Sequence, residues 1–301
     1  MLSLFLVFTT GKNMPAQIEI NPQFKQALEL INNSSKHIFI TGKAGAGKST
    51  LLDYAFKNSS KNMVIVAPTG VAALNVHGQT IHRFFAFPIN VTPEKIANYE
   101  VTPRVKRIYK QLQTLVIDEV SMLRADIFDC IDTFLRIYGP DSEQAFGGVQ
   151  LVLVGDLYQL PPVITNQEAP YFAQRYSSPY FFSAEAFRCI NLEVIELSKI
   201  YRQKDTDFIE LLSRIRSNSA TSQDLQILNR HTDSSDNDQD FRITLTTTNQ
   251  MAENLNRQKL AALPGRSYKS QAVIDGGFQN EYFPTAEVLE LKEGAQIMFL
   301  N

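Results

Sequence analysis

Residues 42–49 have the types and spacing of a phosphate-binding loop. They fit the pattern G-x-x-x-x-G-K-[ST] through Gly42, Gly47, Lys48 and Ser49. Glycines let backbone N–H groups curl around an anion, the lysine adds a mobile positive charge, and the serine hydroxyl is a Mg²⁺ ligand. We predict that the loop binds a nucleoside triphosphate with Mg²⁺; the bland alternative is a flexible glycine turn with a solvated lysine. The residues expected to line the nucleotide are Gly42, Ala44, Gly45, Ala46, Gly47, Lys48, Ser49 and Thr50.

Two adjacent carboxylates follow a buried apolar run about 70 residues later in the chain. The segment TLVIDEV ends in Asp118 and Glu119, at the edge where a parallel sheet presents side chains to a ligand. We expect Asp118 to hold the Mg²⁺ that Ser49 also binds, and Glu119 to polarise the water that attacks the γ-phosphate. The alternative is an Asp-Glu pair that starts a surface helix.

Two further polar residues have the chemistry of a γ-phosphate site. Gln159, in GDLYQLPPV, is followed by two stiff prolines and is expected to hydrogen-bond the γ-phosphate or the attacking water. Arg202, in LSKIYRQ, is expected to neutralise charge that develops on the γ-phosphate. A plain tight turn and a salt-bridged surface arginine are the respective alternatives.

The elements that must position these residues are apolar, β-branched runs separated by helical segments. Runs this uniformly apolar predict a parallel sheet covered by helices on both faces, which is a nucleotide-binding α/β architecture. An aromatic- and proline-rich excursion at about residues 84–110 is interpreted as an inserted subdomain. The five expected strands lie in residues 37–41, 63–68, 114–120, 149–155 and 192–197.

Composition narrows the class of protein. The chain has 301 residues, a formal net charge of −2 and two cysteines, Cys130 and Cys189, far apart in the sequence. Isolated cysteines favour a reducing compartment over secretion, so we expect a cytoplasmic protein, or a nuclear or mitochondrial one in a eukaryote. Both cysteines are expected to be buried and neither to bind a metal. The N-terminal run LSLFLVF is too short to span a bilayer, so no membrane partner is expected.

The order of several motifs resembles the PIF-type (petite integration frequency) DNA helicases of superfamily 1, group B, with RecD-like helicases as the nearest relatives. The segments that carry the resemblance are GKAGAGKST, APTGVAALNVHGQTIHRFF, VIDEVSML, FGGVQLVLVGDLYQLPPV and LSKIYRQ. It covers roughly residues 15–301, and the stretch from Asp118 through FGGVQLVLVGDLYQLPPV is its most specific part.

The resemblance implies an ATP-dependent motor that moves 5′ to 3′ on single-stranded DNA and unwinds forked duplex or G-quadruplex DNA. It implies a monomer, and roles in DNA repair, recombination and telomere maintenance. Lys48, Ser49, Asp118, Glu119, Gln159 and Arg202 match the family's ATP and Mg²⁺ positions. Pro68, Thr69, Gly70, Thr80 and His82 match the segment that contacts the DNA backbone in the family. The PTG turn could independently offer N–H groups and a hydroxyl to a phosphate, whereas His82 alone would more often be structural.

The chain departs from the family pattern in three places. Phe24 stands where relatives carry an adenine-reading glutamine, so Gln23 is the substitute reader. The net charge is slightly acidic, so DNA binding must rest on a local face. The family's last two motifs have no counterpart before Asn301. We therefore expect the 301 residues alone to hydrolyse ATP slowly, with little stimulation by DNA, and not to unwind a fork.

The expected domains are an N-terminal extension (1–14), a RecA-like ATPase domain (15–190) and a partial, truncated second RecA-like domain (191–301). A second α/β pattern is expected to begin at residues 242–250, after the polar stretch HTDSSDNDQD. Two functions of other classes stay open. One is a nucleotide-dependent DNA-binding switch that does not translocate, and the other is a nucleotide kinase, for which no lid-like arginine cluster is present.

Overall fold

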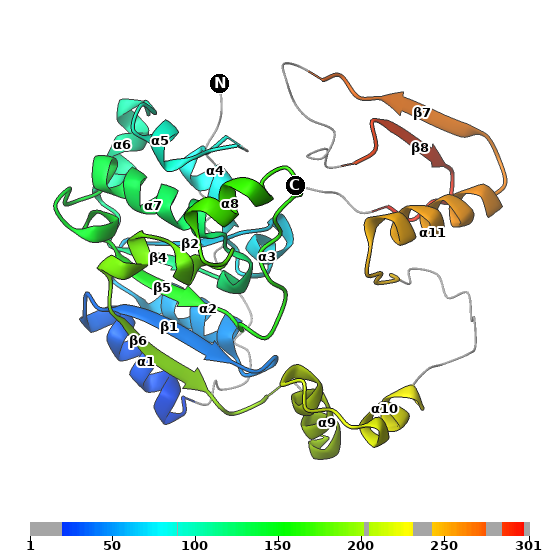
Figure 1. Cartoon of the computed structure of the whole chain (residues 1–301), viewed down its shortest axis with the longest axis horizontal. Coiled ribbons are helices and arrows are strands. Elements are labelled where there is room, and N and C mark those ends of the chain that lie inside the picture. Colours follow the sequence, from blue (N-terminus) through cyan, green and yellow to red (C-terminus); the bar gives the residue numbers. More distant parts are fainter. Residues whose placement is uncertain (1–19, 89, 202–204, 231–242, 275–284, 298–301) are drawn as a thin grey trace. The chain divides into compact units, whose positions relative to one another are not determined.

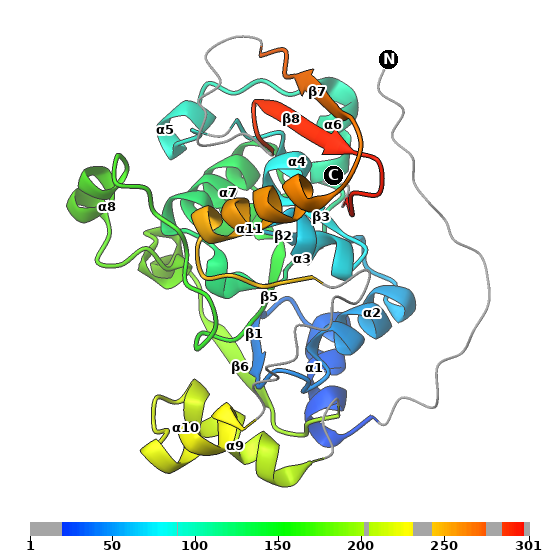
Figure 2. The ribbon, with the colours of Figure 1, turned by 90° about the vertical axis from the view of Figure 1, so that its right-hand side faces the viewer.

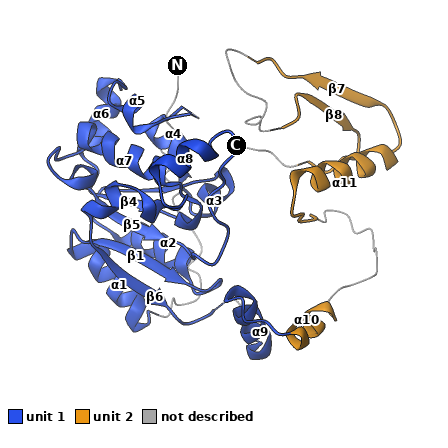
Figure 3. Ribbon diagram, in the orientation of Figure 1, with its two compact units in different colours: residues 1–221 blue, residues 222–301 orange. Residues whose placement is uncertain are grey.

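The computed structural model describes residues 20–88, 90–201, 205–230, 243–274 and 285–297. The expected 1–14 extension and Arg202 lie outside the described residues. The chain divides into two compact units, residues 1–221 and 222–301 (Figure 3). The expected domain boundary at 190/191 stays a prediction, and the strand that follows it belongs to the sheet of unit 1.

Unit 1 contains a parallel sheet, as the sequence predicts (Figure 1). Its described strands run in the order β3-β2-β4-β5-β1-β6, and every neighbouring pair is parallel. The expected third strand is shorter than predicted, because β4 ends at Ile117, before the two carboxylates. The two-residue β3 was not predicted, since two residues carry no periodic signal. The strands are β1 (His37–Gly42), β2 (Met63–Ala67), β3 (Gln79–Thr80), β4 (Thr114–Ile117), β5 (Gln150–Val154) and β6 (Leu192–Leu197).

Alternate residues of the central strands feed two hydrophobic cores. Leu115 and Leu153 belong to one buried cluster, while Val116, Val152 and Val154 belong to the other. Successive side chains of a strand point to opposite faces of a sheet, so a strand covered on both faces must be apolar throughout. This explains the unbroken apolar runs in the sequence.

Helices cover both faces of the sheet. The helices α1 and α2 contact β1, and α1 also contacts β6 (Figure 1 and Figure 2). Asn21 caps α1 by accepting from the Phe24 N–H, and Pro22 occupies the first turn. The helices of unit 1 are α1 (Pro22–Asn33), α2 (Lys48–Asn58), α3 (Gly70–Asn75), α4 (Ile81–Phe85), α5 (Pro93–Ile96), α6 (Pro103–Lys110), α7 (Ala125–Tyr138), α8 (Ala169–Arg175) and α9 (Thr206–Arg216). Short 3₁₀ turns lie at η1 (Val120–Met122), η2 (Ala145–Gly148), η3 (Phe181–Ser183) and η4 (Ala186–Cys189).

The excursion between β3 and β4 forms the short helices α4, α5 and α6. From the sequence, Phe84, Phe85 and Phe87 of this excursion could offer a stacking surface to DNA bases or form a core cluster. Phe85 is fully buried and its ring stacks on Phe87 and Tyr109, with Phe134 of α7 at their edges. The core alternative therefore holds for Phe85 and Phe87, because buried rings cannot receive a base.

Unit 2 has a helical start and an antiparallel strand pair. It contains α10 (Ser222–Asn229), α11 (Asn249–Ala262), β7 (Ser267–Gln271) and β8 (Val288–Lys292). The strand expected at the start of a second α/β pattern is absent over residues 243–248, the described part of that segment. Whether this unit is part of a second RecA-like domain stays a prediction.

The two cysteines differ in environment. Cys130 is buried, as expected, and burial raises the pKa of its thiol, but Cys189 is exposed, contrary to expectation. Among the described residues, no cluster of three or more His, Cys, Asp or Glu side chains could hold a metal. None of the helices in the described ranges has the length and apolarity needed to cross a bilayer.

Candidate active site

The site lies where three adjacent strands of the sheet end. β4, β5 and β1 are neighbours, with Ile117 paired to Leu153 and Ile40 paired to Val154. All three strands are parallel, so their carboxyl ends meet at one edge. The segments that follow them therefore lie side by side: the phosphate loop, the Asp118-Glu119 pair and the GDLYQ turn.

The phosphate loop adopts backbone conformations that favour glycine. Gly42 has φ +150°, and a Cβ at this residue would lie 2.5 Å from the Leu197 carbonyl oxygen. Gly47 has φ +87° and caps α2 without a side chain. Ser49 and Thr50 are exposed in the first turn of α2. The N–H groups of this turn have no partner within the helix, so it is a ready anion site.

Lys48 is held inside its own loop. Its Nζ donates to the carbonyl oxygens of Gly42 at 2.7 Å and Lys43 at 3.3 Å. Burial lowers the pKa of Lys48, while the carboxylates of Asp156, Glu119 and Asp118 oppose that shift. The lysine therefore stands among three carboxylates, and a nucleotide phosphate would compete for it with two carbonyl oxygens.

The two carboxylates after β4 have different environments. Asp118 is only 5% exposed, and burial raises the pKa of its carboxyl to about 6. Glu119 has φ +50° and ψ +42°, a left-handed conformation that is uncommon for a non-glycine residue. This backbone turn follows the end of β4 at Ile117. Strain of this kind concentrates at functional sites, so it supports a role for Glu119.

The side chain of Gln159 is hydrogen-bonded to Asp156, a buried aspartate that follows β5. The Asp156 carboxylate accepts from the Gln159 Nε2 at 3.1 Å and forms a two-pronged ion pair with Arg216 of α9, at 2.7 and 2.9 Å. Burial alone would raise the pKa of Asp156, but the hydrogen bonds from Arg216 and Gln159 hold it below its ordinary value. Asp156 is therefore an ionised, fully paired carboxylate beside the phosphate loop.

Tyr201 packs against Gly47 of the phosphate loop. Its ring carbon Cδ2 would lie 3.5 Å from a Cβ at Gly47, and its hydroxyl accepts from the Asn21 Nδ2 at 3.1 Å. Gln23, the expected adenine reader, donates its Nε2 to the Ser198 hydroxyl at 2.9 Å. The start of α1 and the segment after β6 therefore meet beside the phosphate loop, and Gln23 lies in that contact.

Asp156, Arg216 and Tyr201 were not predicted as site residues. Asp156 lies in the GDLYQ turn, shortly after a buried apolar run. A carboxylate at that position could have been predicted to belong to the site. Arg216 is 60 residues away from its partner on a different element, so no local pattern could have joined them. Tyr201 directly precedes the expected Arg202. Its contacts with Gly47 and Asn21 join residues that are far apart in the sequence, so no local pattern predicts them.

The five expected DNA contacts cluster at the ends of β2 and β3. The two strands are paired, with Ala67 opposite Thr80. Thr69 caps α3 by accepting from the Ala72 N–H at 3.2 Å, and Thr80 caps α4 by accepting from the Arg83 N–H at 3.2 Å. Pro68 and Gly70 flank Thr69, and a Cβ at Gly70 would meet no atom within 4 Å. Each threonine hydroxyl accepts a hydrogen bond in its cap and also carries a proton, which is a donor of the kind that a phosphate oxygen accepts.

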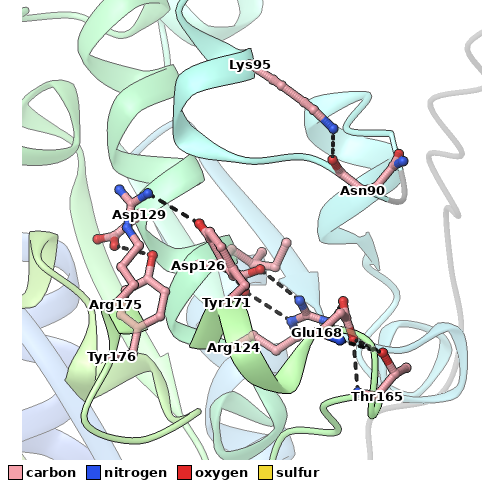
Figure 4. A network of polar contacts seen from close by, with 11 residues as sticks. Asn90, Lys95, Arg124, Asp126, Asp129, Thr165, Glu168, Tyr171, Arg175 and Tyr176 are labelled. Carbon is pink, nitrogen blue, oxygen red and sulfur yellow. Dashed lines mark hydrogen bonds and ion pairs between the residues drawn. The ribbon is translucent and has the colours of Figure 1, made fainter. Parts of the chain in front are cut away.

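His82 lies close to an ion-pair network at the starts of α7 and α8. Burial and Arg124 lower the pKa of His82, and Asp126 opposes the shift, so the ring is neutral at pH 7. Arg124 pairs with Asp126 and with Glu168, both within 2.8 Å, and Figure 4 shows it between the two carboxylates. The bland interpretation of His82, a structural histidine, is therefore consistent with its surroundings.

The sequence matches the PIF1-like helicase family over residues 19–226. The human protein named ATP-dependent DNA helicase PIF1 is 33% identical over 274 residues, which cover 88% of this chain and 41% of the human protein. The chain therefore spans less than half the length of this relative.

Two solved structures from Bacteroides have the same fold over most of the chain. Pif1 bound to single-stranded DNA has a TM-score of 0.81 at 34% identity, over 91% of this chain and 63% of that one. Pif1 helicase in complex with ADP-AlF₃ and single-stranded DNA has a TM-score of 0.77 at 33% identity, over 91% and 64%. Both comparisons support the α/β fold of this chain.

Proposed function

Because the chain belongs to the PIF1-like helicase family, we propose that it provides the ATP-hydrolysing part of a DNA helicase that moves 5′ to 3′ on single-stranded DNA, and that these 301 residues alone do not unwind a fork. The observation that carries the proposal is the junction of β1, β4 and β5, where Lys48, Asp118, Glu119 and Gln159 follow adjacent strand ends. The chain spans 41% of the human relative, so the activity of a complete helicase is stated here only as a proposal.

The proposed ATP site uses the phosphate loop and the paired carboxylates. The loop residues Gly42–Thr50 hold the phosphates through backbone N–H groups, and Lys48 leaves its two carbonyl partners to bind them. Ser49 and Asp118 suit Mg²⁺, because a hydroxyl and a carboxylate are hard oxygen donors. The metal would shield the charge of the phosphates. Exposure of Ser49 at the start of α2 supports its assignment to the metal.

Hydrolysis is assigned to residues of the β4 and β5 ends and to one arginine. Glu119 accepts a proton from the attacking water, and Gln159 orients that water or the γ-phosphate. Arg202, outside the described residues, neutralises the γ-phosphate in the transition state. Gln23 reads adenine, which is supported by its position beside Tyr201 and the phosphate loop.

The proposed DNA contacts are Pro68, Thr69, Gly70, Thr80 and His82. Their position at the ends of two paired strands supports one continuous surface for a phosphate backbone. Relatives were solved with single-stranded DNA, which supports the same partner here. Binding of forked or G-quadruplex DNA, action as a monomer, and roles in repair, recombination and telomere maintenance are proposed from the resemblance alone. A cytoplasmic, nuclear or mitochondrial location is proposed from the isolated cysteines.

Repeated turnover of ATP separates the motor from a nucleotide-dependent switch. The chain is incubated with a large excess of Mg·ATP, and phosphate release is counted per protein molecule. A motor releases many phosphates per molecule, even at a slow rate. A switch changes its affinity for single-stranded DNA when nucleotide binds, yet stops after one phosphate or fewer. Nucleotide-dependent DNA binding without turnover would therefore favour the switch.

A further inference from the structure

Asp156 is the centre of a buried polar cluster beside the phosphate loop. Only 1% of this residue is exposed, and both carboxylate oxygens are occupied. Oδ1 accepts from the Tyr158 N–H at 3.2 Å and from the Arg216 Nη2 at 2.7 Å. Oδ2 accepts from the Gln159 Nε2 at 3.1 Å and from the Arg216 Nε at 2.9 Å. The Asp156 carboxylate therefore bonds to α9 through Arg216, and to the turn after β5 through Tyr158 and the expected γ-phosphate sensor, Gln159.

The contact with Asp156 determines which end of the Gln159 side chain faces a ligand. An ionised carboxylate only accepts hydrogen bonds, so it selects the NH₂ end of the amide. One N–H of the amide is then used by Asp156, and the Oε1 atom faces away from that carboxylate. Oε1 is the acceptor of the amide, so it is the atom that can accept a hydrogen bond from the attacking water. Held in this way, Gln159 presents an acceptor to that water, while its second N–H can still donate to a phosphate oxygen.

Arg216 holds Asp156 in place with a rigid fork. The planar guanidinium donates two parallel hydrogen bonds to the carboxylate, a geometry that lysine cannot reproduce. Its carbon Cζ also lies 4.2 Å from the centre of the Tyr158 ring, which packs it from a second side. Two hydrogen bonds to Asp156 and one contact with the Tyr158 ring therefore hold Arg216 against the turn that carries Gln159.

We propose that Arg216 is a positioning residue for ATP hydrolysis: through Asp156 it holds the Gln159 amide with Oε1 directed to the attacking water. The inference rests on the proposed function, because it concerns the same reaction.

A double-mutant cycle between Arg216 and Gln159 tests this inference. Single-turnover hydrolysis, with each protein in saturating excess over ATP, is measured for Arg216→Ala, Gln159→Ala and the double variant, so that changes in affinity do not enter. Because misplacing a reacting group by about 1 Å can cost about 100-fold in rate, we expect Arg216→Ala to slow hydrolysis by about 10- to 100-fold. In the Gln159→Ala background the same change should cost less than about 2-fold, since there is no amide left to position.

Arg214→Ala is the matched control. Arg214 lies on the same helix, is 39% exposed in its side chain and pairs with Glu210 at 3.6 Å. Its removal should change the rate by less than about 2-fold. Arg216→Lys keeps the charge but not the fork, so it should restore only part of the rate. If Arg216→Ala does not fold, as judged by its thermal unfolding, the cycle is run with Arg216→Lys instead.

Equal losses in the two backgrounds would overturn the inference, because Arg216 would then act independently of Gln159. An unchanged rate in Arg216→Ala would overturn it as well. Lys48→Ala is measured alongside as a separate test of the proposed function. Hydrolysis that persists in Lys48→Ala would refute the ATP site itself, whereas hydrolysis that fails in Lys48→Ala with additive Arg216 and Gln159 losses would refute only the positioning role.

Discussion

The backbone N–H of Tyr201 donates a hydrogen bond of 2.9 Å to the carbonyl oxygen of Gly45, in the middle of the phosphate loop. Tyr201 also accepts from Asn21, the cap of α1, through its hydroxyl. The segment after β6 thus connects the loop that would hold phosphates to the helix that carries Gln23. Nucleotide phosphates and the nucleotide base are expected on either side of this tyrosine.

Gln23→Ala should weaken selection of adenine. Its amide has the donor and acceptor that adenine requires, and losing one such hydrogen bond costs about 1 kcal/mol, or about 5- to 10-fold in affinity. Equilibrium binding of fluorescent ATP and GTP analogues measures the effect. ATP affinity should fall while GTP affinity stays unchanged. Gln26→Ala, an exposed position on the same helix, is the control. Equal losses for both nucleotides would contradict a base-reading role.

Glu119→Gln should separate binding from turnover. The variant keeps the size of the side chain but cannot accept a proton, so hydrolysis should fall by about 10² to 10⁴ while Mg·ATP still binds. Rapid-quench hydrolysis and nucleotide binding are measured on the same preparation. A parallel loss of binding and turnover would show that Glu119 has a structural or metal-binding role.

Asp118→Asn should stabilise the ligand-free protein above pH 6. Burial raises the carboxyl pKa to about 6 from 3.8, so the native state binds a proton more tightly than the unfolded state. The ionised form therefore costs stability above about pH 6, and this cost fades as the pH falls from 6 to below 4. The shift corresponds to an upper limit of about 3 kcal/mol. Urea unfolding at pH 8 and pH 4 measures it, and an equal gain at both pH values would contradict a buried charge.

Thr69→Asp should weaken binding of single-stranded DNA without loosening α3. Aspartate caps a helix as well as threonine does, but it places a negative charge where a DNA phosphate is expected. Thr69→Ser keeps both the cap and the hydroxyl and serves as the control. Fluorescence anisotropy across a salt series measures affinity, and the loss should be several-fold and largest at low salt. Unchanged affinity in Thr69→Asp would remove this surface from the DNA path.

The parallel sheet and the family could be predicted because both depend on local signals. Covered strands must be apolar along their whole length, and the phosphate loop needs glycine at fixed positions, as Gly42 and Gly47 show. The α/β fold with a parallel sheet and the resemblance to PIF-type helicases are confirmed. The end of β4 was misplaced because the predicted strand was extended through Asp118 and Glu119 to Val120, whereas the apolar run and the strand both end at Ile117 and the backbone turns to a left-handed conformation at Glu119.

Other features depend on contacts between distant residues. The ion pair between Asp156 and Arg216 joins two elements with no shared sequence pattern. The burial of Phe85 depends on α7 packing over the inserted helices, which composition alone left undecided. The exposure of Cys189 likewise follows from its position at the end of a 3₁₀ turn rather than from its residue type. The roles of the site residues, including Arg202, stay predictions.

Phosphate release from Mg·ATP by the 301-residue chain and by its Lys48→Ala variant tests the central claim most directly. The unchanged chain should release phosphate over repeated turnovers, and Lys48→Ala should release none above background, because it removes the positive charge that the loop offers to the phosphates. Lys43→Ala, in the same loop, controls for the loss of a lysine and should retain hydrolysis. Turnover by Lys48→Ala near that of the unchanged chain would contradict the assignment of this loop as the ATP site.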